Sequence, residues 1–369
     1  MAKTLIRRIT KSFFVGLTLL LVLAFLLACL GGSIHPSSAW LMGFLVLAQP
    51  YLAVLLIISL IFWLITRPII AILPLVAIVI GWTNLGHLFA VNGLSNKVAK
   101  ADSVIRVVTW NTQSFNGLSN LPEGKRKAGE QIAATLLELD ADFICLQEFN
   151  HAYDREEGNH IKFFTKQYPH YFFSKDYSRR NGQYVSGSIL FSKHRILQTK
   201  RIPYPGAESL IWADVLVGRD TLRVFTTHLQ SFLFKPEDYE GMEKIKTREE
   251  EAITASKPII RKMKAAFLRR AEQAKMVRDA LDESPYPYII CGDFNDVPNS
   301  YTYRTIKGNA KDAFLEKGFG IGRTFISLAP TLRIDYILHP TVFQTVQHFT
   351  VDEDLSDHIL QGADIRLKK

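Results

Sequence analysis

The chain has 369 residues, of which 48% are hydrophobic and 21% charged, with a formal net charge of +9 at pH 7. The length allows two or three domains, and three cysteines exclude a disulfide framework. The positive charge suits anionic partners such as nucleic acid, inositol phosphates or anionic lipid headgroups. No run of basic and interleaved aromatic residues predicts a nucleic-acid track.

Charge is distributed very unevenly along the chain. Between Lys11 and Lys97 the only formally charged residue is Arg67. About 20 apolar residues suffice to cross the hydrocarbon core of a membrane as a helix. We therefore expect residues 1–91 to form a membrane domain with three transmembrane helices, at about residues 13–30, 40–65 and 69–90.

The basic residues near these spans predict their orientation. Lys3, Arg7, Arg8 and Lys11 precede the first span, Arg67 separates the second from the third, and the loop between the first two spans carries no Lys or Arg. Positive residues mark cytoplasmic loops. Three crossings then place the rest of the chain across the membrane, which in a bacterium is the periplasm, with the bilayer as a partner.

One cysteine near the N-terminus offers an alternative to the first transmembrane span, namely a lipoprotein leader. Leu26-Leu27-Ala28-Cys29 resembles a lipoprotein cleavage box behind a basic, apolar leader. Cleavage there would still leave two apolar spans. Cys145 and Cys291 fall within strand-like apolar runs, where a buried thiol acts as a small hydrophobe.

Residues 92–103 are polar and predict a linker, and residues 104–369 suffice for one sizeable domain. Apolar spacing predicts helices at 125–139 and within 249–281. Runs rich in β-branched residues predict strands at 104–110, 142–147, 188–192, 210–217, 222–227, 288–291, 334–338 and 363–367. Such a mixture indicates a layered α/β or α+β domain.

Five short strings lie at or just past the ends of strand-like runs. Each supplies a carboxylate, an amide or an imidazole: Thr109-Trp110-Asn111, Leu146-Gln147-Glu148, Thr227-His228-Leu229, Gly292-Asp293-Phe294-Asn295 and Ser356-Asp357-His358. Mg²⁺ prefers carboxylate and carbonyl oxygens and is usually held by one or two carboxylates plus substrate phosphates. Histidines can meet phosphate charge or carry protons. The set predicts a metal-assisted phosphoester hydrolase.

In this order the strings resemble the motifs of the endonuclease/exonuclease/phosphatase superfamily, with Arg333-Ile334-Asp335-Tyr336 as a sixth motif. That superfamily includes pancreatic-type deoxyribonucleases, AP endonucleases, inositol-polyphosphate 5-phosphatases and neutral sphingomyelinases. The resemblance runs from about Val104 to the C-terminus. It implies that the transmembrane helices are followed by a four-layer α-β-β-α sandwich, in which two packed mixed sheets are flanked by helices.

The resemblance implies a metal site at Asn111 and Glu148, with Asp357 as a third carboxylate near the ion. Carboxamide and carboxylate oxygens are hard ligands, so Mg²⁺ is the expected cofactor, with Mn²⁺ as a substitute. Taken alone, an Asn or Glu after a strand is usually a turn residue or a solvated strand end; the order of the motifs favours the ligand role.

The resemblance also implies roles for the catalytic residues. Asp293 orients or deprotonates the attacking water, and Asn295 donates a hydrogen bond to a phosphate oxygen. His228 and His358 face the phosphate, with Asp335 as the partner of His358. A carboxylate beside an imidazole fixes its tautomer and keeps it basic. Which imidazole protonates the leaving group stays open.

Two departures from the family pattern concern substrate binding. Gly187-Ser188-Ile189 stands where many relatives have Gly-Asn-Ala, so the predicted substrate contact is the hydroxyl of Ser188. Residues 231–266 form a long stretch, with Phe232, Phe234 and Tyr239 near its start, that is either a substrate-recognition lid or an exposed helical excursion.

The predicted function is therefore a membrane-anchored, Mg²⁺-dependent phosphodiesterase that uses in-line attack by water. Nucleic acid and phospholipid or sphingolipid headgroups are rival substrates, with phosphomonoesters third. A pseudoenzyme that only binds a phosphorylated ligand is the non-enzymatic alternative. Retention of Asn111, Glu148, Asp293 and both histidines argues against it.

Overall fold

The computed structural model describes residues 2–93, 99–100, 103–118, 122–206, 208–247 and 252–368. The chain divides into two compact units. A helical unit comprises Met1–Phe89 and Val297–Arg304, and an α/β unit comprises Ala90–Asp296 and Thr305–Lys369. Each unit has its own hydrophobic core.

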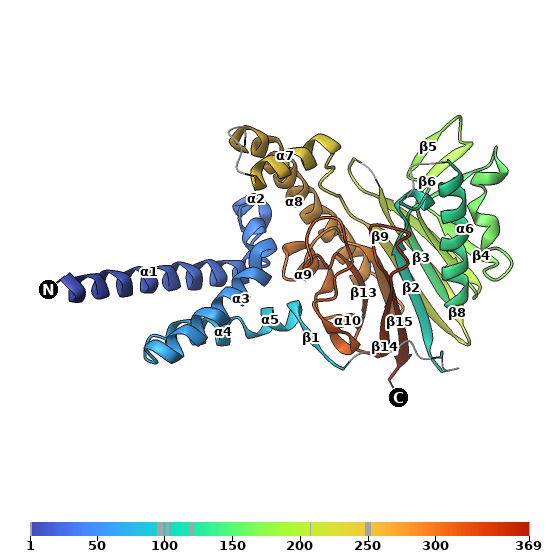
Figure 1. The fold of residues 1–369 in the computed structure, drawn as a ribbon. Helices are drawn as coiled ribbons and strands as arrows, with labels where there is room; N and C mark the ends of the chain where they lie inside the picture. Colours follow the sequence, from blue (N-terminus) through green and yellow to red (C-terminus); the bar gives the residue numbers. More distant parts are fainter. Residues whose placement is uncertain are drawn as a thin grey trace. The chain divides into compact units, whose positions relative to one another are not determined.

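The helical unit is built on two long apolar helices. Leu5–Gly31 and Met42–Thr66 are long and apolar enough to cross a membrane, with mean hydropathies of 2.9 and 2.4, and only 22% of each is buried. Core helices of soluble proteins are mostly buried, and these two are not. The helices of the unit are α1 (Ala2–Gly31), α2 (Pro36–Ala39), α3 (Met42–Thr66), α4 (Ile72–Ile80), α5 (Trp82–Leu88) and the first part of α9 (Tyr301–Lys307) (Figure 1).

Helices α1 and α3 run antiparallel. Nε1 of Trp63 donates to Oγ1 of Thr18 at 2.8 Å toward one end of the pair. At the other end a Cβ built on Gly31 would lie 2.7 Å from Cγ2 of Val46. The expected third span at 69–90 consists of two shorter helices, α4 and α5, with Gly81 between them.

The α/β unit contains two mixed sheets. The six-stranded sheet has the order β11-β13-β10-β9-β8-β7, and the seven-stranded sheet has the order β14-β15-β2-β3-β6-β4 with β5 paired to β6. A two-stranded ladder joins β1 (Ala90–Val91) to β12 (Phe319–Gly320). The remaining strands are β2 (Ile105–Asn111), β3 (Phe143–Ala152), β4 (His170–Phe173), β5 (Tyr177–Arg179), β6 (Tyr184–Ser192), β7 (Ile196–Pro203), β8 (Ser209–Val217), β9 (Asp220–His228), β10 (Tyr288–Asp293), β11 (Lys311–Asp312), β13 (Asp335–His339), β14 (Phe343–Val351) and β15 (Leu360–Leu367).

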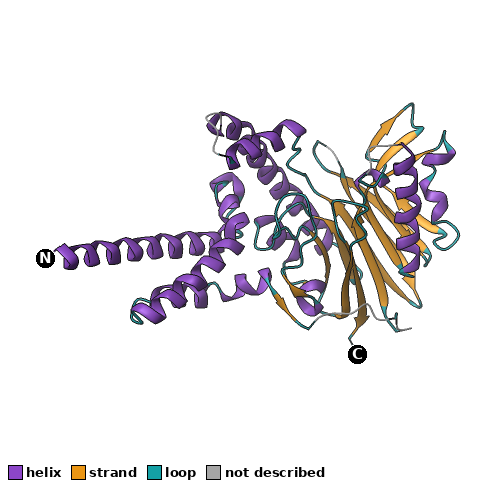
Figure 2. Cartoon of the chain, viewed as in Figure 1, coloured by secondary structure: helices purple, strands orange, loops and turns teal. Residues whose placement is uncertain are grey.

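The two sheets pack face to face, and helices cover their outer faces (Figure 2). Both sheets contribute to the core between them, including Val107 and Cys145 from one sheet and Val224 and Cys291 from the other. The helices and short 3-10 turns of this unit are α6 (Pro122–Glu138), α7 (Pro236–Lys246), α8 (Ala252–Asp282), the last part of α9, α10 (Ala313–Lys317), η1 (Gln113–Phe115), η2 (Glu156–Gly158) and η3 (His160–Phe163). This arrangement is the predicted α-β-β-α sandwich.

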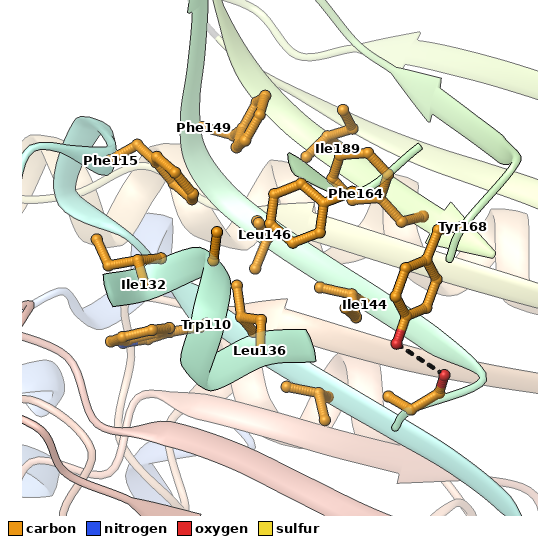
Figure 3. Close-up of a cluster of buried hydrophobic side chains, with 14 of the residues drawn as sticks. Trp110, Phe115, Ile132, Leu136, Ile144, Leu146, Phe149, Phe164, Tyr168 and Ile189 are labelled. Carbon is orange, nitrogen blue, oxygen red and sulfur yellow. Dashed lines mark hydrogen bonds between the residues drawn. The ribbon is translucent and has the colours of Figure 1, made fainter. Parts of the chain in front are cut away.

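A second core fills the space between the seven-stranded sheet and α6. Ile132 and Leu136 of the helix pack with Trp110 and Leu146 of the strands and with a group of phenylalanines (Figure 3). The hydroxyl of Tyr168 closes this cluster by donating to the backbone oxygen of Ala141 at 3.0 Å. This packing fixes the strands whose ends carry the predicted metal ligands.

The central strands fall where the sequence predicts them, whereas several edge strands were missed. Strands β4, β7 and β14 lie at sheet edges, and β7 is half-buried or exposed throughout. An edge strand buries too little apolar surface to leave a strong pattern. The predicted helix within 249–281 is α8, which begins at Ala252 and ends at Asp282.

Candidate active site

The site centres on the carboxylate of Asp293, at the end of β10. The side chain is 1% exposed. Parallel pairing with β9 sets Asp293 beside His228, and antiparallel pairing with β13 sets it beside Asp335. Gly292 permits this close approach: its φ is +138°, and a Cβ there would overlap the backbone of Thr227.

Two amides hold the Asp293 carboxylate. The backbone N–H of Asn295 donates to Oδ1 at 2.7 Å and its Nδ2 donates to Oδ2 at 3.1 Å. Nδ2 of Asn111 donates to Oδ2 at 3.1 Å. Burial, and then the neighbouring Asp335, raise the pKa of Asp293 to about 6, against the lowering effect of the two histidines. Asp293 is therefore a base poised near neutral pH.

The predicted ligands Asn111 and Glu148 also meet. Asn111 ends β2, which runs parallel to β3, and its Nδ2 lies 3.3 Å from Oε1 of Glu148. At Glu148 strand β3 departs from regular pairing with β6 and φ is +52°. Such strained backbone outside glycine is concentrated at functional sites. The departure leaves the Glu148 side chain 39% exposed beside the buried Asp293.

His358 is held by the partner predicted for it. Its Nδ1 lies 2.9 Å from Oδ2 of Asp335, and its Nε2 lies 3.7 Å from Oδ2 of Asp293. Burial alone would lower the pKa of His358, but the carboxylates of Asp335 and Asp293 outweigh it and raise the pKa to about 9. The ring is therefore cationic at neutral pH, as a group facing phosphate should be.

His228, the last residue of the neighbouring strand β9, approaches the same carboxylate of Asp293. Its Nε2 lies 3.5 Å from Oδ2 of Asp293, while its Nδ1 lies 2.6 Å from Oε2 of Glu208. Burial lowers the pKa of His228, but Glu208, Asp293 and Glu148 together raise it to about 10. Two imidazolium groups therefore flank one carboxylate.

The donor set fits a divalent cation. Oδ1 of Asp335 is buried without a hydrogen-bond partner among the described residues. Burial raises the pKa of Asp357, and the carboxylates of Glu148 and Asp335 raise it further, against His358. A divalent cation would relieve such a concentration of buried negative charge.

Two candidate ligand sets are present in this region. Asp293, Asp335 and His358 each offer a ligand atom within 4.8 Å of the others. In that set the imidazole is already occupied by Asp335, and Mg²⁺ prefers oxygen ligands. Asn111, Glu148 and Asp357 offer oxygens only, so this predicted set is the better match to a hard cation.

The two predicted substrate features are less closely tied to the site. Ser188 is 1% exposed and lies next to the irregular pairing of β3 with β6. Its backbone N–H donates to Oγ of Ser174 at 2.9 Å, and its backbone oxygen accepts from the N–H of Ser174 at 2.9 Å. The contact between the Ser188 hydroxyl and the substrate stays a prediction.

The stretch 231–266 contains Tyr239 of α7. Burial, and then the carboxylate of Asp357, raise the pKa of Tyr239, so α7 lies within electrostatic range of the site.

Sequence reasoning missed several residues that support the site. Glu208 lies in the loop before β8, and no motif marks it. Gln147 stands inside a motif, where it joins the two sheets by donating to Oγ1 of Thr226 at 2.9 Å. Nε1 of Trp110 donates to the backbone oxygen of His358 at 2.7 Å, and Oγ of Ser356 donates to that of Asn111 at 2.7 Å. For Trp110, Gln147 and Ser356, their places within the motifs were the only sequence feature that could have indicated these supporting roles.

Arg270 of α8 supports the loop after Asp293. Its side chain is fully buried, with Nε 3.2 Å from Oδ2 of Asp296 and Nη1 donating to the backbone oxygen of Gln230 at 3.0 Å. The hydroxyl of Tyr336 donates to the backbone oxygen of Asp296 at 2.9 Å. Asp296 is thus part of the scaffold of the site.

Solved structures share this fold. An endonuclease/exonuclease/phosphatase from Beutenbergia cavernae DSM 12333 is 19% identical, with a TM-score of 0.52 over 72% of each chain. The human Nocturnin catalytic domain with bound sulfate anion is 17% identical, with a TM-score of 0.50 over 74% of this chain and 97% of that one. No curated protein matches the chain. These identities establish the fold alone.

Two family models match the sequence. Residues 11–88 match a domain of unknown function, DUF8431. Residues 108–358 match the Endonuclease/Exonuclease/phosphatase family, and this range contains the motif residues from Asn111 to His358. Members of that family hydrolyse phosphoester bonds with the help of a divalent metal. The chain belongs to the endonuclease/exonuclease/phosphatase family and is a metal-dependent phosphoester hydrolase.

Proposed function

We propose that this protein is a membrane-anchored, Mg²⁺-dependent phosphodiesterase whose catalytic unit faces away from the cytoplasm. The observation that carries the proposal is the arrangement around Oδ2 of Asp293. Two imidazoles lie 3.5 and 3.7 Å from it, and two amides donate to the same carboxylate. One base is thus surrounded by donors suited to a phosphate.

The arrangement supports in-line attack by water. Asp293, with its pKa raised to about 6, orients the water and accepts its proton. Cationic His228 and His358 stabilise negative charge on the phosphate oxygens. Asn295 would donate to one of those oxygens by giving up one of the bonds that its Nδ2 makes to Oδ2 of Asp293 and to the backbone oxygen of Leu229. Asp335 keeps Nε2 of His358 directed toward the reacting centre, because it occupies Nδ1 at 2.9 Å.

Asn111, Glu148 and Asp357 would hold the metal. When bound, Mg²⁺ polarises the phosphate and stabilises the leaving oxygen. The charges of the site support this role, because buried carboxylates otherwise repel both one another and an incoming phosphate. A cation adjacent to Glu148 reduces that repulsion.

The arrangement of helices α1 and α3 supports the proposed orientation of the chain across the membrane. Because α1 and α3 run antiparallel, the basic N-terminus and Arg67 fall at the same end of the pair. The positive-inside rule assigns that end to the cytoplasm. The segment Val297–Arg304 lies at the other end, where Arg304 contacts Ser33 and the backbone of Cys29.

A catalytic unit anchored in this way meets membrane lipids first. The substrate that we propose is a phosphodiester in a lipid headgroup, with nucleic acid as the rival. Full-length protein in nanodiscs should hydrolyse labelled phospholipid in Mg²⁺ and lose this activity in EDTA. Asp293→Asn should lower hydrolysis by roughly 10²-fold or more, whereas the exposed substitution Asp220→Asn should leave it unchanged.

Plasmid DNA and RNA form the second arm of this experiment. Cleavage of nucleic acid without lipid hydrolysis would overturn the lipid assignment and leave the mechanism intact. Turnover that persists after metal removal would overturn the mechanism itself.

A further inference from the structure

The helical unit contains more buried polar side chains than an anchor requires. Gln49 of α3 is fully buried, and Asn84 of α5 is 8% exposed. Polar side chains within apolar helices are costly unless they are paired, and they usually serve a function. Both residues find their partners in the segment Val297–Arg304, which belongs to the same unit.

Asn299 is the centre of this network. Its side chain is fully buried, and its Nδ2 donates to Oε1 of Gln49 at 3.0 Å and to the backbone oxygen of Asn84 at 2.8 Å. Its Oδ1 lies 2.8 Å from Nδ1 of His87. Every polar atom of the Asn299 amide group is therefore engaged by the helices, in a backbone conformation with φ of +67°.

Arg304 provides a second attachment one turn further along. Its Nη1 donates to Oγ of Ser33 at 3.0 Å, and its Nη2 donates to the backbone oxygen of Cys29 and to the side chain of Asn84. The segment also lies directly against the end of α1. A Cβ built on Gly32 would overlap the backbone oxygen of Asn299 and lie 2.6 Å from Cδ of Arg304.

The segment begins immediately after the catalytic loop. Asn299 is four residues from Asn295 and six from Asp293. We propose that Asn299 is a positioning residue, through which Gln49, Asn84 and His87 of the helical unit fix the chain that leaves the catalytic loop. The helical unit would thereby act on the catalytic loop through the chain itself, because the segment that it holds follows Asp293 by only a few residues. The catalytic part of this inference rests on the proposed function.

Matched substitutions in full-length protein in nanodiscs test the proposal. Gln49→Leu removes one partner of Asn299 without opposing membrane insertion, because leucine is favoured in an apolar helix. Thr18→Val is its control, since it removes a buried hydrogen bond to Trp63 in the same unit. Gly32→Ala displaces the segment sterically, and Gly16→Ala is its control, because a Cβ there meets nothing within 4 Å.

Two measurements are made on each variant: kcat and KM for bis(p-nitrophenyl) phosphate in Mg²⁺, and amide hydrogen exchange in residues 297–304. Gln49→Leu and Gly32→Ala should speed exchange in that segment and lower kcat roughly 10- to 100-fold, with little change in KM, because small misplacements of catalytic groups have effects of this size. Both controls should behave as wild type.

The two readouts separate the possible failures. Unchanged exchange in both test variants would overturn the attachment. Faster exchange with unchanged kcat would overturn the positioning role. If wild-type protein hydrolyses no phosphodiester, the proposed function fails, while the exchange measurement still decides whether Asn299 is held by the helices.

Discussion

Nδ1 of His228 lies 2.6 Å from Oε2 of Glu208, a residue that belongs to none of the sequence motifs. Burial raises the pKa of Glu208, and the imidazolium of His228 lowers it. The same pairing helps raise the pKa of His228 to about 10. Among the carboxylates around His228, Glu208 therefore contributes most to keeping this phosphate-facing imidazole charged as the pH rises.

Glu208→Gln should move the alkaline limb of the pH–rate profile to lower pH. A raised pKa means that the cation persists until pH rises through about 10 in the wild type. Without the carboxylate, the lowering effect of burial is no longer outweighed to the same extent. Profiles of kcat against pH for wild type, Glu208→Gln and the exposed control Asp220→Asn measure this shift. If the alkaline limb of Glu208→Gln lies at the same pH as in the wild type, the titration of His228 does not produce that limb.

Asp293→Asn should lower kcat by roughly 10²- to 10⁴-fold, the usual contribution of a positioned base. The substitution keeps the shape and one oxygen, which in the position of Oδ2 still accepts from Nδ2 of Asn295 and Nδ2 of Asn111, but it loses the bond from the backbone N–H of Asn295 to Oδ1. Steady-state kinetics with a soluble phosphodiester gives the value, and Tm shows whether the variant is folded. A loss of less than fivefold in a folded variant would contradict the assignment.

Mg²⁺ should raise Tm of the wild-type protein, and Glu148→Gln should weaken that rise. A ligand that binds only the folded state stabilises it by mass action. The side chain of the predicted ligand Glu148 is 39% exposed, so an ion can reach it from solvent. Thermal unfolding across a Mg²⁺ titration tests this independently of activity. Equal Mg²⁺ responses in wild type and Glu148→Gln would place the ion elsewhere.

Arg106→Met should destabilise the α/β unit strongly. Nε and Nη2 of Arg106 donate to the two carboxylate oxygens of Asp364 at 2.6 and 2.8 Å, and both residues are almost fully buried. Removing one partner of such a pair costs about 3–5 kcal/mol, because a buried charge is left behind. The double variant with Asp364→Leu should cost less. Denaturant unfolding followed by tryptophan fluorescence gives both values, and equal losses would argue against the pair.

A reporter fused after Lys369 should reveal the topology. If the basic N-terminus and Arg67 lie in the cytoplasm and α4 and α5 together make the third crossing, the C-terminus lies across the membrane. Alkaline phosphatase should then be active in the fusion and green fluorescent protein dark. The reverse pattern would place the catalytic unit in the cytoplasm and make nucleic acid the favoured substrate.

The amino-acid sequence by itself determined the reaction class and most of the candidate site. Asn111 and Asp293 are the last residues of β2 and β10, two buried central strands whose apolar runs are strong local signals. The order of these strings resembles the family's motif order, and that resemblance implied that their side chains form one site. In the structure, parallel pairing of β10 with β9 sets Asp293 beside His228, and antiparallel pairing of β10 with β13 sets Asp293 beside Asp335.

Only the tertiary structure identified Glu208 and Asn299. Glu208 reaches His228 from a loop, and Asn299 pairs with Gln49, a residue 250 positions away in the sequence. Neither contact leaves a periodic or spacing signal, because each depends on where unrelated segments come together in space. The same holds for the edge strands β4, β7 and β14, whose pairing is decided by the sheet that they join and not by their own hydrophobic pattern.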